Sequence, residues 1–248
     1  MTEHDKEIKK KRSGKHKRKA RVFPVHEPGW NLWQVLLLIA LVTLAEFPLG
    51  WLQTPQNLDS LLGRLHYVWV GLGEGIFYVV LTAILLWRTR RTWNDVGFVR
   101  VKGRFLFLGF FTGVFLFISI GLLGNLLTHL VGVPAPQSFT QAVIGAKQPW
   151  EFVLFLLLAG VVAPLKEEML FRGLIYPPLR LAYGKGKGIL FTGAMFGLLH
   201  LDPLRFLPLF LGGVVLTWLY ERSGSLWPSI LAHGVWNALM AGAVWIQR

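Results

Sequence analysis

The sequence predicts an all-α fold, a polytopic bundle of about seven transmembrane helices. Hydrophobic residues make up 53% of the 248 residues and charged residues only 16%, whereas a soluble domain is usually about a quarter charged. Apolar runs of about 20 residues recur along the chain, and a helix of that length crosses the hydrocarbon core of a bilayer. The chain has no cysteine, so a disulfide framework, a thiolate zinc site and a cysteine nucleophile are excluded.

Positive charge is concentrated at the start of the sequence and in short loops. The net charge is +13, and ten of the 26 Lys and Arg residues lie between Lys6 and Arg21. This distribution follows the positive-inside rule and predicts a cytoplasmic N-terminus. We interpret residues 1–28 as a basic, disordered tail that lies on anionic lipid. Nucleic acid is not an expected partner, because no nucleic-acid-binding motif accompanies the charge.

Residues 29–149 form a first set of predicted membrane helices. The loop Arg88–Arg104 carries six Lys or Arg residues and one Asp, which marks it as cytoplasmic. The loops Gln53–Arg64 and Gly132–Pro149 carry few cations and are placed on the opposite side. The helices are expected at about Trp30–Leu52, His66–Trp87 and Phe105–Val131.

Residues 150–248 form a second set. Pro164 removes a backbone hydrogen bond and is expected to kink the first of these helices. The loop Tyr176–Gly188 carries three cations and is placed on the cytoplasmic side. No internal repeat is visible, which argues against a transporter built from duplicated halves. The helices are expected at about Trp150–Leu174, Ile189–Leu201, Phe206–Tyr220 and Leu226–Ile246, and the second and third are short.

A cluster of ionisable residues interrupts the first helix of this second set. Ionisable residues at membrane depth are costly and indicate a functional site. Glu168 and Arg172 are four residues apart on one helix face, so we expect an ion pair between them. Glu167 lies about 100° around the helix from Glu168 and has no local partner, which suits a general base. We interpret four other polar residues inside apolar runs as packing or interfacial groups: Glu46, Glu74, Asn125 and His129.

Two further polar pairs repeat the four-residue spacing on later helices. Phe196 and His200 share one face, and His233 and Asn237 share another. Counting about 1.5 Å per residue, Glu167, His200 and His233 lie roughly 10–16 Å from the inner ends of their helices. We therefore expect these side chains at a common depth.

These residues carry a resemblance to a known family. The three motifs are Glu167-Glu168-x-x-x-Arg172, Phe196-x-x-x-His200 and His233-x-x-x-Asn237. In order and spacing, they resemble the CPBP (Abi, type II CAAX prenyl protease) family of intramembrane proteases, from about Trp150 to Ile246. The resemblance implies that residues 150–248 are the catalytic helices.

The resemblance also implies a role for each motif residue. Glu167 and His200 would activate a water molecule, and His233 and Asn237 would stabilise the oxyanion of the tetrahedral intermediate. The remaining three motif residues would support this site. Glu168 and Arg172 would hold the geometry of their helix, and Phe196 would pack beside His200.

The expected activity is that of an intramembrane endopeptidase, CAAX-protease-like, acting on a membrane-associated peptide or protein. A non-catalytic membrane immunity or scaffold protein is the alternative, and a proton-coupled transporter is a third reading of the buried carboxylate. Metal-independent chemistry is favoured, because no His-Glu-x-x-His motif is present. If a divalent metal such as zinc is used, its ligands would be Glu167, His200 and His233. We expect an integral protein of a prokaryotic plasma membrane.

Overall fold

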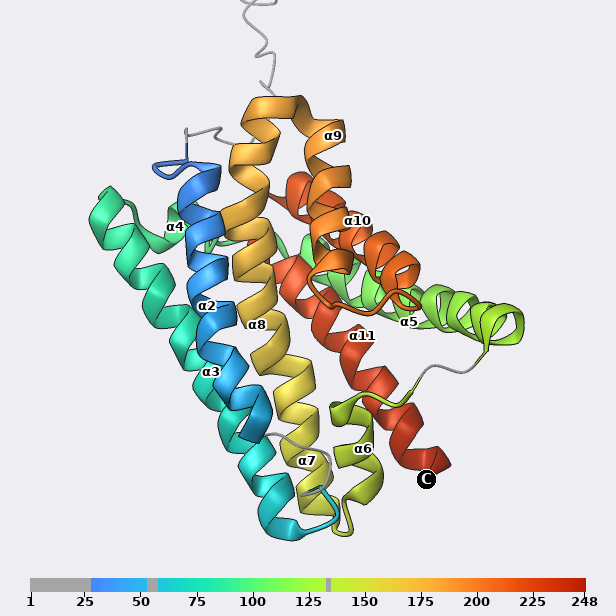
Figure 1. The fold of residues 1–248 in the computed structure, drawn as a ribbon. Coiled ribbons are helices and arrows are strands. Elements are labelled where there is room, and N and C mark those ends of the chain that lie inside the picture. Colours follow the sequence, from blue (N-terminus) through green and yellow to red (C-terminus); the bar gives the residue numbers. More distant parts are fainter. Residues whose placement is uncertain (1–27, 53–57, 133–134) are drawn as a thin grey trace, which may run out of the picture.

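The computed structural model describes residues 28–52, 58–132 and 135–248 (Figure 1). Helices joined by short loops make up these ranges, and no strand occurs in them. The predicted all-α helical bundle is confirmed. The predicted basic tail falls almost wholly outside the described residues.

The first three predicted helices are present, with their boundaries shifted by a few residues. The predicted loops 88–104 and 132–149 each contain a short helix. In chain order the elements are α2 (Leu32–Leu52), α3 (Leu61–Thr89), α4 (Trp93–Val96), α5 (Gly103–Val131) and α6 (Ser138–Gly145). Among the described residues, α3, α5 and α11 (Leu226–Gln247) are long and apolar enough to cross a membrane. The protein is an integral membrane protein.

The fourth predicted helix is longer than expected and changes its winding twice. It starts as α7 (Pro149–Leu157), widens to a π-helical turn at Leu158–Val162, and continues as α8 (Ala163–Glu168). A second π-helical segment, Met169–Ile175, leads into α9 (Tyr176–Leu198). The residues on either side of Pro164 keep helical dihedral angles, so a wider turn before the proline stands where we expected a kink.

The prediction of a loop at residues 176–188 is wrong. The helix runs through Tyr176 and reverses only at Gly184, whose φ of 77° is favourable for glycine. Gly188 lets the two arms of the hairpin approach, since a Cβ there would lie 3.0 Å from Arg180 Cα. The polar side chains on this helix have a partner on a later helix, because Tyr176 and Arg180 both donate to Glu221 at 2.8 Å.

The next helix, α10 (Phe206–Ser223), packs against the two arms of α9. The second arm of α9 ends at Leu198 rather than Leu201, which places His200 in the following turn. With about 1.5 Å per residue, this 14-residue arm is too short to cross a bilayer. The number of full spans stays a prediction.

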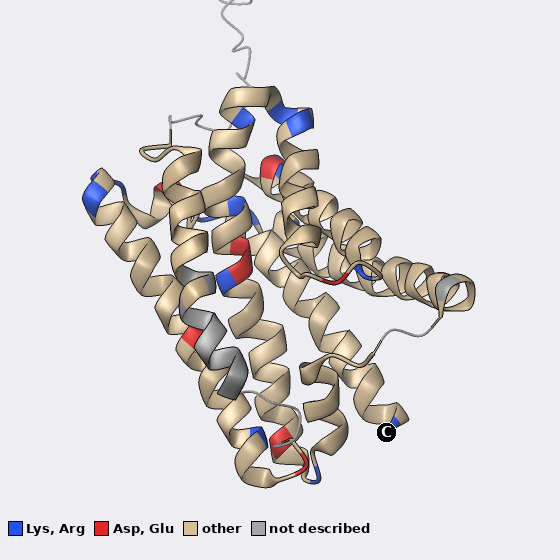
Figure 2. Cartoon of the chain, viewed as in Figure 1, with Lys and Arg blue, Asp and Glu red and all other residues tan. Residues whose placement is uncertain are grey.

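Successive loops between the long helices lie at opposite ends of the bundle, and contacts hold each end together. At one end, the Trp30 indole donates to Leu174 O, and Ser225 Oγ donates to Val99 O. At the other end, Arg64 and Glu151 form a buried ion pair with an Nε–Oε2 distance of 2.6 Å. Figure 2 shows many of the charged residues at these two ends and others at mid-height, on and beside α8 and in the loop between α9 and α10.

The π-helical turn Leu158–Val162 crosses α11 with its backbone in near contact. A Cβ on Gly234 of α11 would lie 2.3 Å from the carbonyl oxygen of Gly160. By contrast, a Cβ on Gly242 of the same helix would meet nothing within 4 Å. The crossing therefore depends on glycine at position 234 and not at position 242.

Gly234→Ala is expected to destabilise the protein by about 1–3 kcal/mol, because the helices must separate to admit the methyl group. Gly242→Ala is the matched control and is expected to be neutral or stabilising by up to about 1 kcal/mol. Thermal unfolding in detergent measures both. Equal unfolding temperatures for the two variants would contradict this packing.

The carboxylate of Glu221 stabilises the packing of α9 against α10 in a pH-dependent way. Glu221 lies beyond the predicted membrane-spanning stretch of α10. Burial alone would raise its pKa, but hydrogen bonds from Arg180 and Tyr176 hold the pKa below its usual value. A lowered pKa in the folded state means that the stabilisation is present above the unfolded-state pKa and is lost as the pH falls through the folded value.

Glu221→Gln is therefore expected to lower stability at pH 7 by about 1.5–3 kcal/mol. The difference from the wild-type protein should shrink as the pH falls below the ordinary glutamate pKa of about 4.3. Thermal unfolding of both proteins across this pH range tests the prediction. A difference that stays constant with pH would count against it.

Candidate active site

The centre of the site is a buried arginine whose three guanidinium nitrogens are all hydrogen-bonded. Arg172 donates from Nη1 to Glu168 Oε1 at 2.8 Å, from Nη2 to Gly213 O at 2.8 Å, and from Nε to Thr217 Oγ1 at 3.2 Å. Arg172 and Glu168 are both 0% exposed. The predicted ion pair is present, and it also ties this helix to α10.

His233 of α11 joins the same carboxylate. Its Nδ1 lies 2.8 Å from Glu168 Oε1, and His233 is only 3% exposed. Because a carboxylate accepts, Nδ1 carries the proton and Nε2 is left to face the site. This contact adds a partner to Glu168 that we did not predict. The second oxygen, Glu168 Oε2, is buried and has no hydrogen-bond partner in the described chain.

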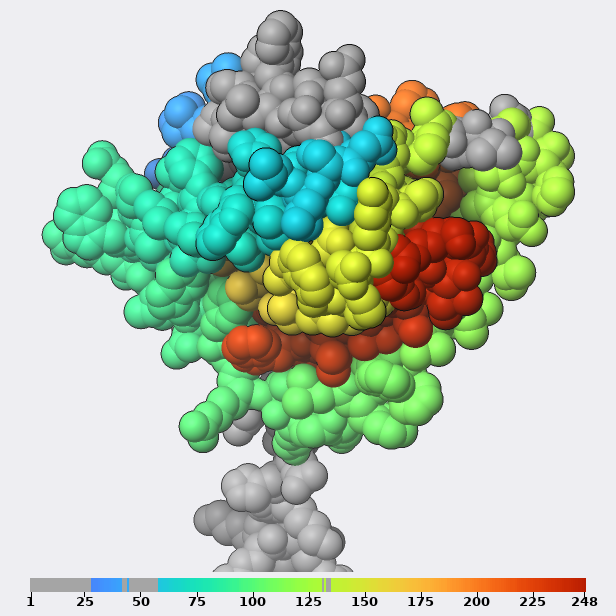
Figure 3. Space-filling model, turned by 90° about the horizontal axis from the view of Figure 1, so that it is seen from below, coloured from blue at the N-terminus to red at the C-terminus, as the bar shows by residue number. Residues whose placement is uncertain are grey.

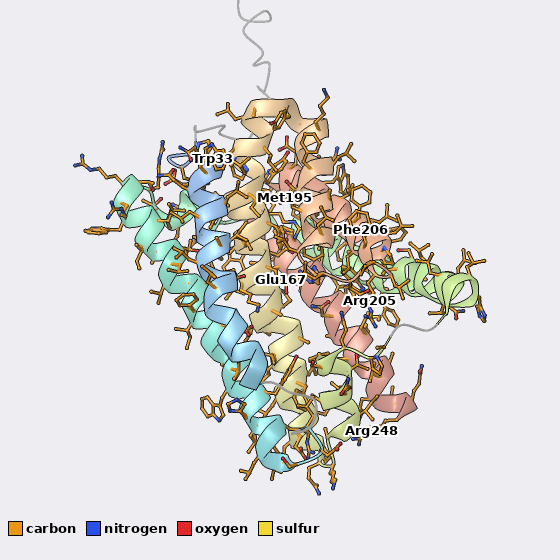
Figure 4. All side chains as sticks on the ribbon, in the orientation of Figure 1. Trp33, Glu167, Met195, Arg205, Phe206 and Arg248 are labelled. Atoms are coloured by element: carbon orange, nitrogen blue, oxygen red, sulfur yellow. The ribbon has the colours of Figure 1, made fainter. Side chains whose placement is uncertain are left out.

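Glu167 lies on the other side of the His233 ring. Its Oε2 is 3.8 Å from His233 Nε2, too far for a direct hydrogen bond but suited to a bridging water molecule. The Glu167 side chain is 22% exposed, whereas that of Glu168 is 0% exposed. Of the two neighbouring carboxylates, Glu167 is therefore the one that water can reach. Figure 4 places Glu167 at about mid-height, between Trp33 at one end and Arg248 at the other.

Phe196 connects the two histidines. Its ring centroid lies 4.8 Å from that of His200 and 5.7 Å from that of His233. The Arg172 guanidinium also lies over the Phe196 ring, with its Cζ 4.9 Å from the ring centroid. The aromatic ring is thus in contact with three of the polar residues that the motifs contain.

His200 is held by the end of its own helix. Its Nδ1 lies 2.6 Å from Phe196 O. Since a carbonyl oxygen only accepts, Nδ1 must donate, and in the neutral ring Nε2 is left as a proton acceptor. The helix end therefore sets the tautomer that a base requires.

Asn237 bonds to a carbonyl that Pro164 leaves unpaired. In the π-helical turn, Ala163 N–H bonds five residues back to Leu158 O. The next such bond would run from residue 164 to Ala159 O, but proline has no N–H. Asn237 Nδ2 donates to Ala159 O at 3.2 Å instead. This bond leaves the second amide hydrogen of Asn237 for another acceptor.

Lys166 is turned away from the cluster by a partner on α3. Lys166 Nζ lies 2.8 Å from Glu74 Oε2, and both side chains are 17% exposed. We had interpreted Glu74 as a packing or interfacial group. It instead pairs with the cation next to Glu167, and so couples α3 to the helix that carries the site.

The three residues named as alternative metal ligands do not form a metal site in this structure. Among the described residues, no group of three or more His, Asp and Glu side chains is placed to hold a metal ion. A metalloendopeptidase assignment finds no support in this part of the chain, and we derive no step through a metal.

Sequence reasoning missed several partners of the motif residues and of the neighbouring Lys166. Gly213 and Thr217 bind Arg172, Glu74 binds Lys166, and Ala159 binds Asn237. Only Glu74 stood out in the sequence, as a carboxylate inside an apolar run. The others are ordinary helix residues, and their main-chain carbonyls carry no sequence signal.

The family comparison matches the part of the chain that holds this site. Residues 149–239 match the family described as type II CAAX prenyl endopeptidase Rce1-like. The match covers part of the chain, from α7 into α11. The predicted resemblance is confirmed, and the Rce1-like region contains all three motifs. At the level of its family, this region indicates a CAAX-protease-like membrane peptidase.

Two curated relatives are similar to the chain at low identity. A putative membrane peptidase YdiL of Bacillus subtilis (strain 168) is 27% identical over 132 residues, which is 53% of this chain and 52% of the relative. The chain thus matches about half the length of that protein. A UPF0177 protein in the abiGi 5′ region of Lactococcus lactis subsp. cremoris is 28% identical over 211 residues, 82% of this chain and 87% of the relative. No solved structure matches the chain.

Proposed function

We propose that the protein is an intramembrane endopeptidase that hydrolyses a peptide bond of a membrane-associated peptide or protein. The observation that carries this proposal is the arrangement of Glu167 and His233, whose side chains face each other across 3.8 Å within an apolar bundle. A water molecule bound between them would lie beside a carboxylate that can take its proton. The Rce1-like match supports the same reaction class.

In the proposed reaction, Glu167 removes a proton from the water, whose oxygen attacks the peptide carbonyl carbon. His200 assists through Nε2, the nitrogen left as an acceptor. The tetrahedral intermediate then breaks its C–N bond, and the proton held by Glu167 passes to the leaving nitrogen. The products are a carboxylic acid, which keeps the second proton of the water, and an amine; transfer of the acid proton to the amine then gives a carboxylate and an ammonium group.

His233 and Asn237 stabilise the oxyanion in this proposal. His233 can donate from Nε2 only as an imidazolium, since its Nδ1 hydrogen is engaged by Glu168. Glu168 accepts the Nδ1 hydrogen of His233, and Arg172 holds that carboxylate in position. Asn237 contributes the amide hydrogen that Ala159 O does not use.

The proposed location is a prokaryotic plasma membrane with the N-terminus in the cytoplasm. The positive-inside distribution supports this orientation. It would place the basic tail, the α4 loop and the α9 hairpin on the anionic inner surface. The substrate is then anchored in or at the same membrane.

The activity is tested with the full chain in proteoliposomes. Candidate substrates come from a comparison of membrane proteomes of deletion and wild-type cells. Hydrolysis in ¹⁸O-labelled water should place one ¹⁸O atom in the new carboxylate. His200→Ala is expected to lower the rate by about 100-fold or more, and His129→Ala, an exposed residue of α5, is the control.

A non-catalytic immunity or scaffold role predicts a different outcome. No proteome difference would appear between the two cell lines, and folded wild-type protein would cleave no candidate. A cellular phenotype unchanged by His200→Ala, with expression retained, would also favour that role.

A further inference from the structure

A long apolar groove lies on the surface of the protein outside the candidate site. It has a volume of about 750 Å³ and is bounded by the α7 end of the long helix, by α11 and by the start of α5. Figure 3 shows α11 in red between yellow α7 and green α5 on the face seen from below. Of the described residues that line it, Arg100 at one end is the only charged one, and most of the others are apolar.

Two glycines make the floor of the groove. Gly160 and Gly234 both line it, and their backbones are in near contact, with Gly160 O 2.3 Å from the position of a Gly234 Cβ. The side chains beside them point outward, since Leu157 and Val161 are each 52% exposed. The groove thus lies where the two backbones cross, between side chains that point outward.

The length of the groove matches one leaflet of a bilayer. On α11 its lining extends from Trp227 to Ala238, a rise of about 16 Å at 1.5 Å per residue. Half of the hydrocarbon core of a bilayer is about 15 Å. A groove that starts at the interfacial Trp227 therefore ends near the midplane.

The charged end of the groove is suited to an anion. Arg100 is exposed, and among the described residues it makes no ion pair or hydrogen bond. Lys102 and Arg104 follow it in the sequence. An arginine at the membrane interface is a strong ligand for a phosphate group.

We propose that this groove binds one acyl chain of an anionic phospholipid from the leaflet on the Arg100 side, with the lipid phosphate at Arg100. A peptide is a poor occupant, because the apolar lining would leave its backbone N–H and C=O groups without partners. An acyl chain has no such groups. The site is independent of hydrolysis, so it stands or falls separately from the proposed activity.

Native mass spectrometry of the full chain in detergent tests this proposal. The probes are phosphatidylglycerol and phosphatidylcholine with identical acyl chains. The wild-type protein should retain one phosphatidylglycerol about fivefold better than phosphatidylcholine, given about 1 kcal/mol per interfacial cation. Arg100→Gln should abolish this preference, whereas Lys187→Gln, an exposed cation on α9, should leave it unchanged.

A second pair of variants tests the position of the chain. Val161→Trp fills the groove from its exposed edge and should lower retention of both lipids. Leu122→Trp, at an exposed position of α5 outside the groove, is the matched control. Equal retention of the two lipids by the wild-type protein, or equal retention by the two Trp variants, would overturn the proposal.

Discussion

Replacing Glu167 with glutamine is expected to reduce peptide-bond hydrolysis by about 100-fold or more, because the amide cannot accept the water proton. The Glu167 side chain makes no hydrogen bond of 3.5 Å or less within the described chain, and its 3.8 Å contact with His233 leaves room for water. Stability should therefore change little. The measurement is the rate of ¹⁸O-labelled product formation in proteoliposomes, together with the unfolding temperature.

The control for this variant is Asp59→Asn, which removes an exposed carboxylate at the far end of the bundle. Its rate should equal that of the wild-type protein. If Glu167→Gln cleaved the substrate as fast as Asp59→Asn, Glu167 could not be the base, although hydrolysis itself would stand.

Replacing Arg172 with methionine is expected to destabilise the protein by about 3–5 kcal/mol, which is the cost of leaving a buried charge without its partner. The side chain is fully buried, and its loss removes one donor each from Glu168, Gly213 O and Thr217 Oγ1. The buried Glu168 carboxylate then keeps only His233 as a partner among the described residues. We expect a large loss of folded protein. The yield of monodisperse protein in detergent and the unfolding temperature measure this effect.

A double variant separates folding from chemistry at this position. Glu168→Met combined with Arg172→Met removes both charges, so part of the lost stability should return. Hydrolysis should not return, because His233 also loses its Glu168 partner. Arg222→Met, at an exposed cation of α10, is the control for loss of an arginine. A double variant as unstable as Arg172→Met alone would contradict the ion-pair account.

The fold was largely predictable because bilayer crossing imposes simple rules on the sequence. Apolar runs of sufficient length located α2, α3, α5, α10 and α11 to within a few residues. The rule failed at residues 176–188, where basic and glycine residues suggested a loop. There a helix persists because Tyr176 and Arg180 share the carboxylate of Glu221, a partner 41 or more residues away.

The residues of the candidate site were predictable, but their contacts were only partly so. Spacing of four along a helix predicted the Glu168–Arg172 pair, and the structure contains it. His233 lies 65 residues from Glu168, and no local pattern indicates that they meet. The bond from Asn237 to Ala159 O follows from the missing N–H of Pro164, which is visible in the sequence only once the π-helical turn is known.

By itself, the sequence determined that this protein is a helical membrane protein whose ionisable residues recur at helical spacing inside apolar runs. It could do so because lipid penalises both unpaired backbone groups and unpaired charge, and each penalty leaves a pattern along one chain segment. Only the tertiary structure decided that Glu168 lies at Nδ1 of His233 and Glu167 near Nε2. It also decided which groups bind Arg172 and where the apolar groove ends. Those contacts join separate helices, and the crossing of two helix backbones at Gly160 and Gly234 is a matter of packing that neither segment specifies alone.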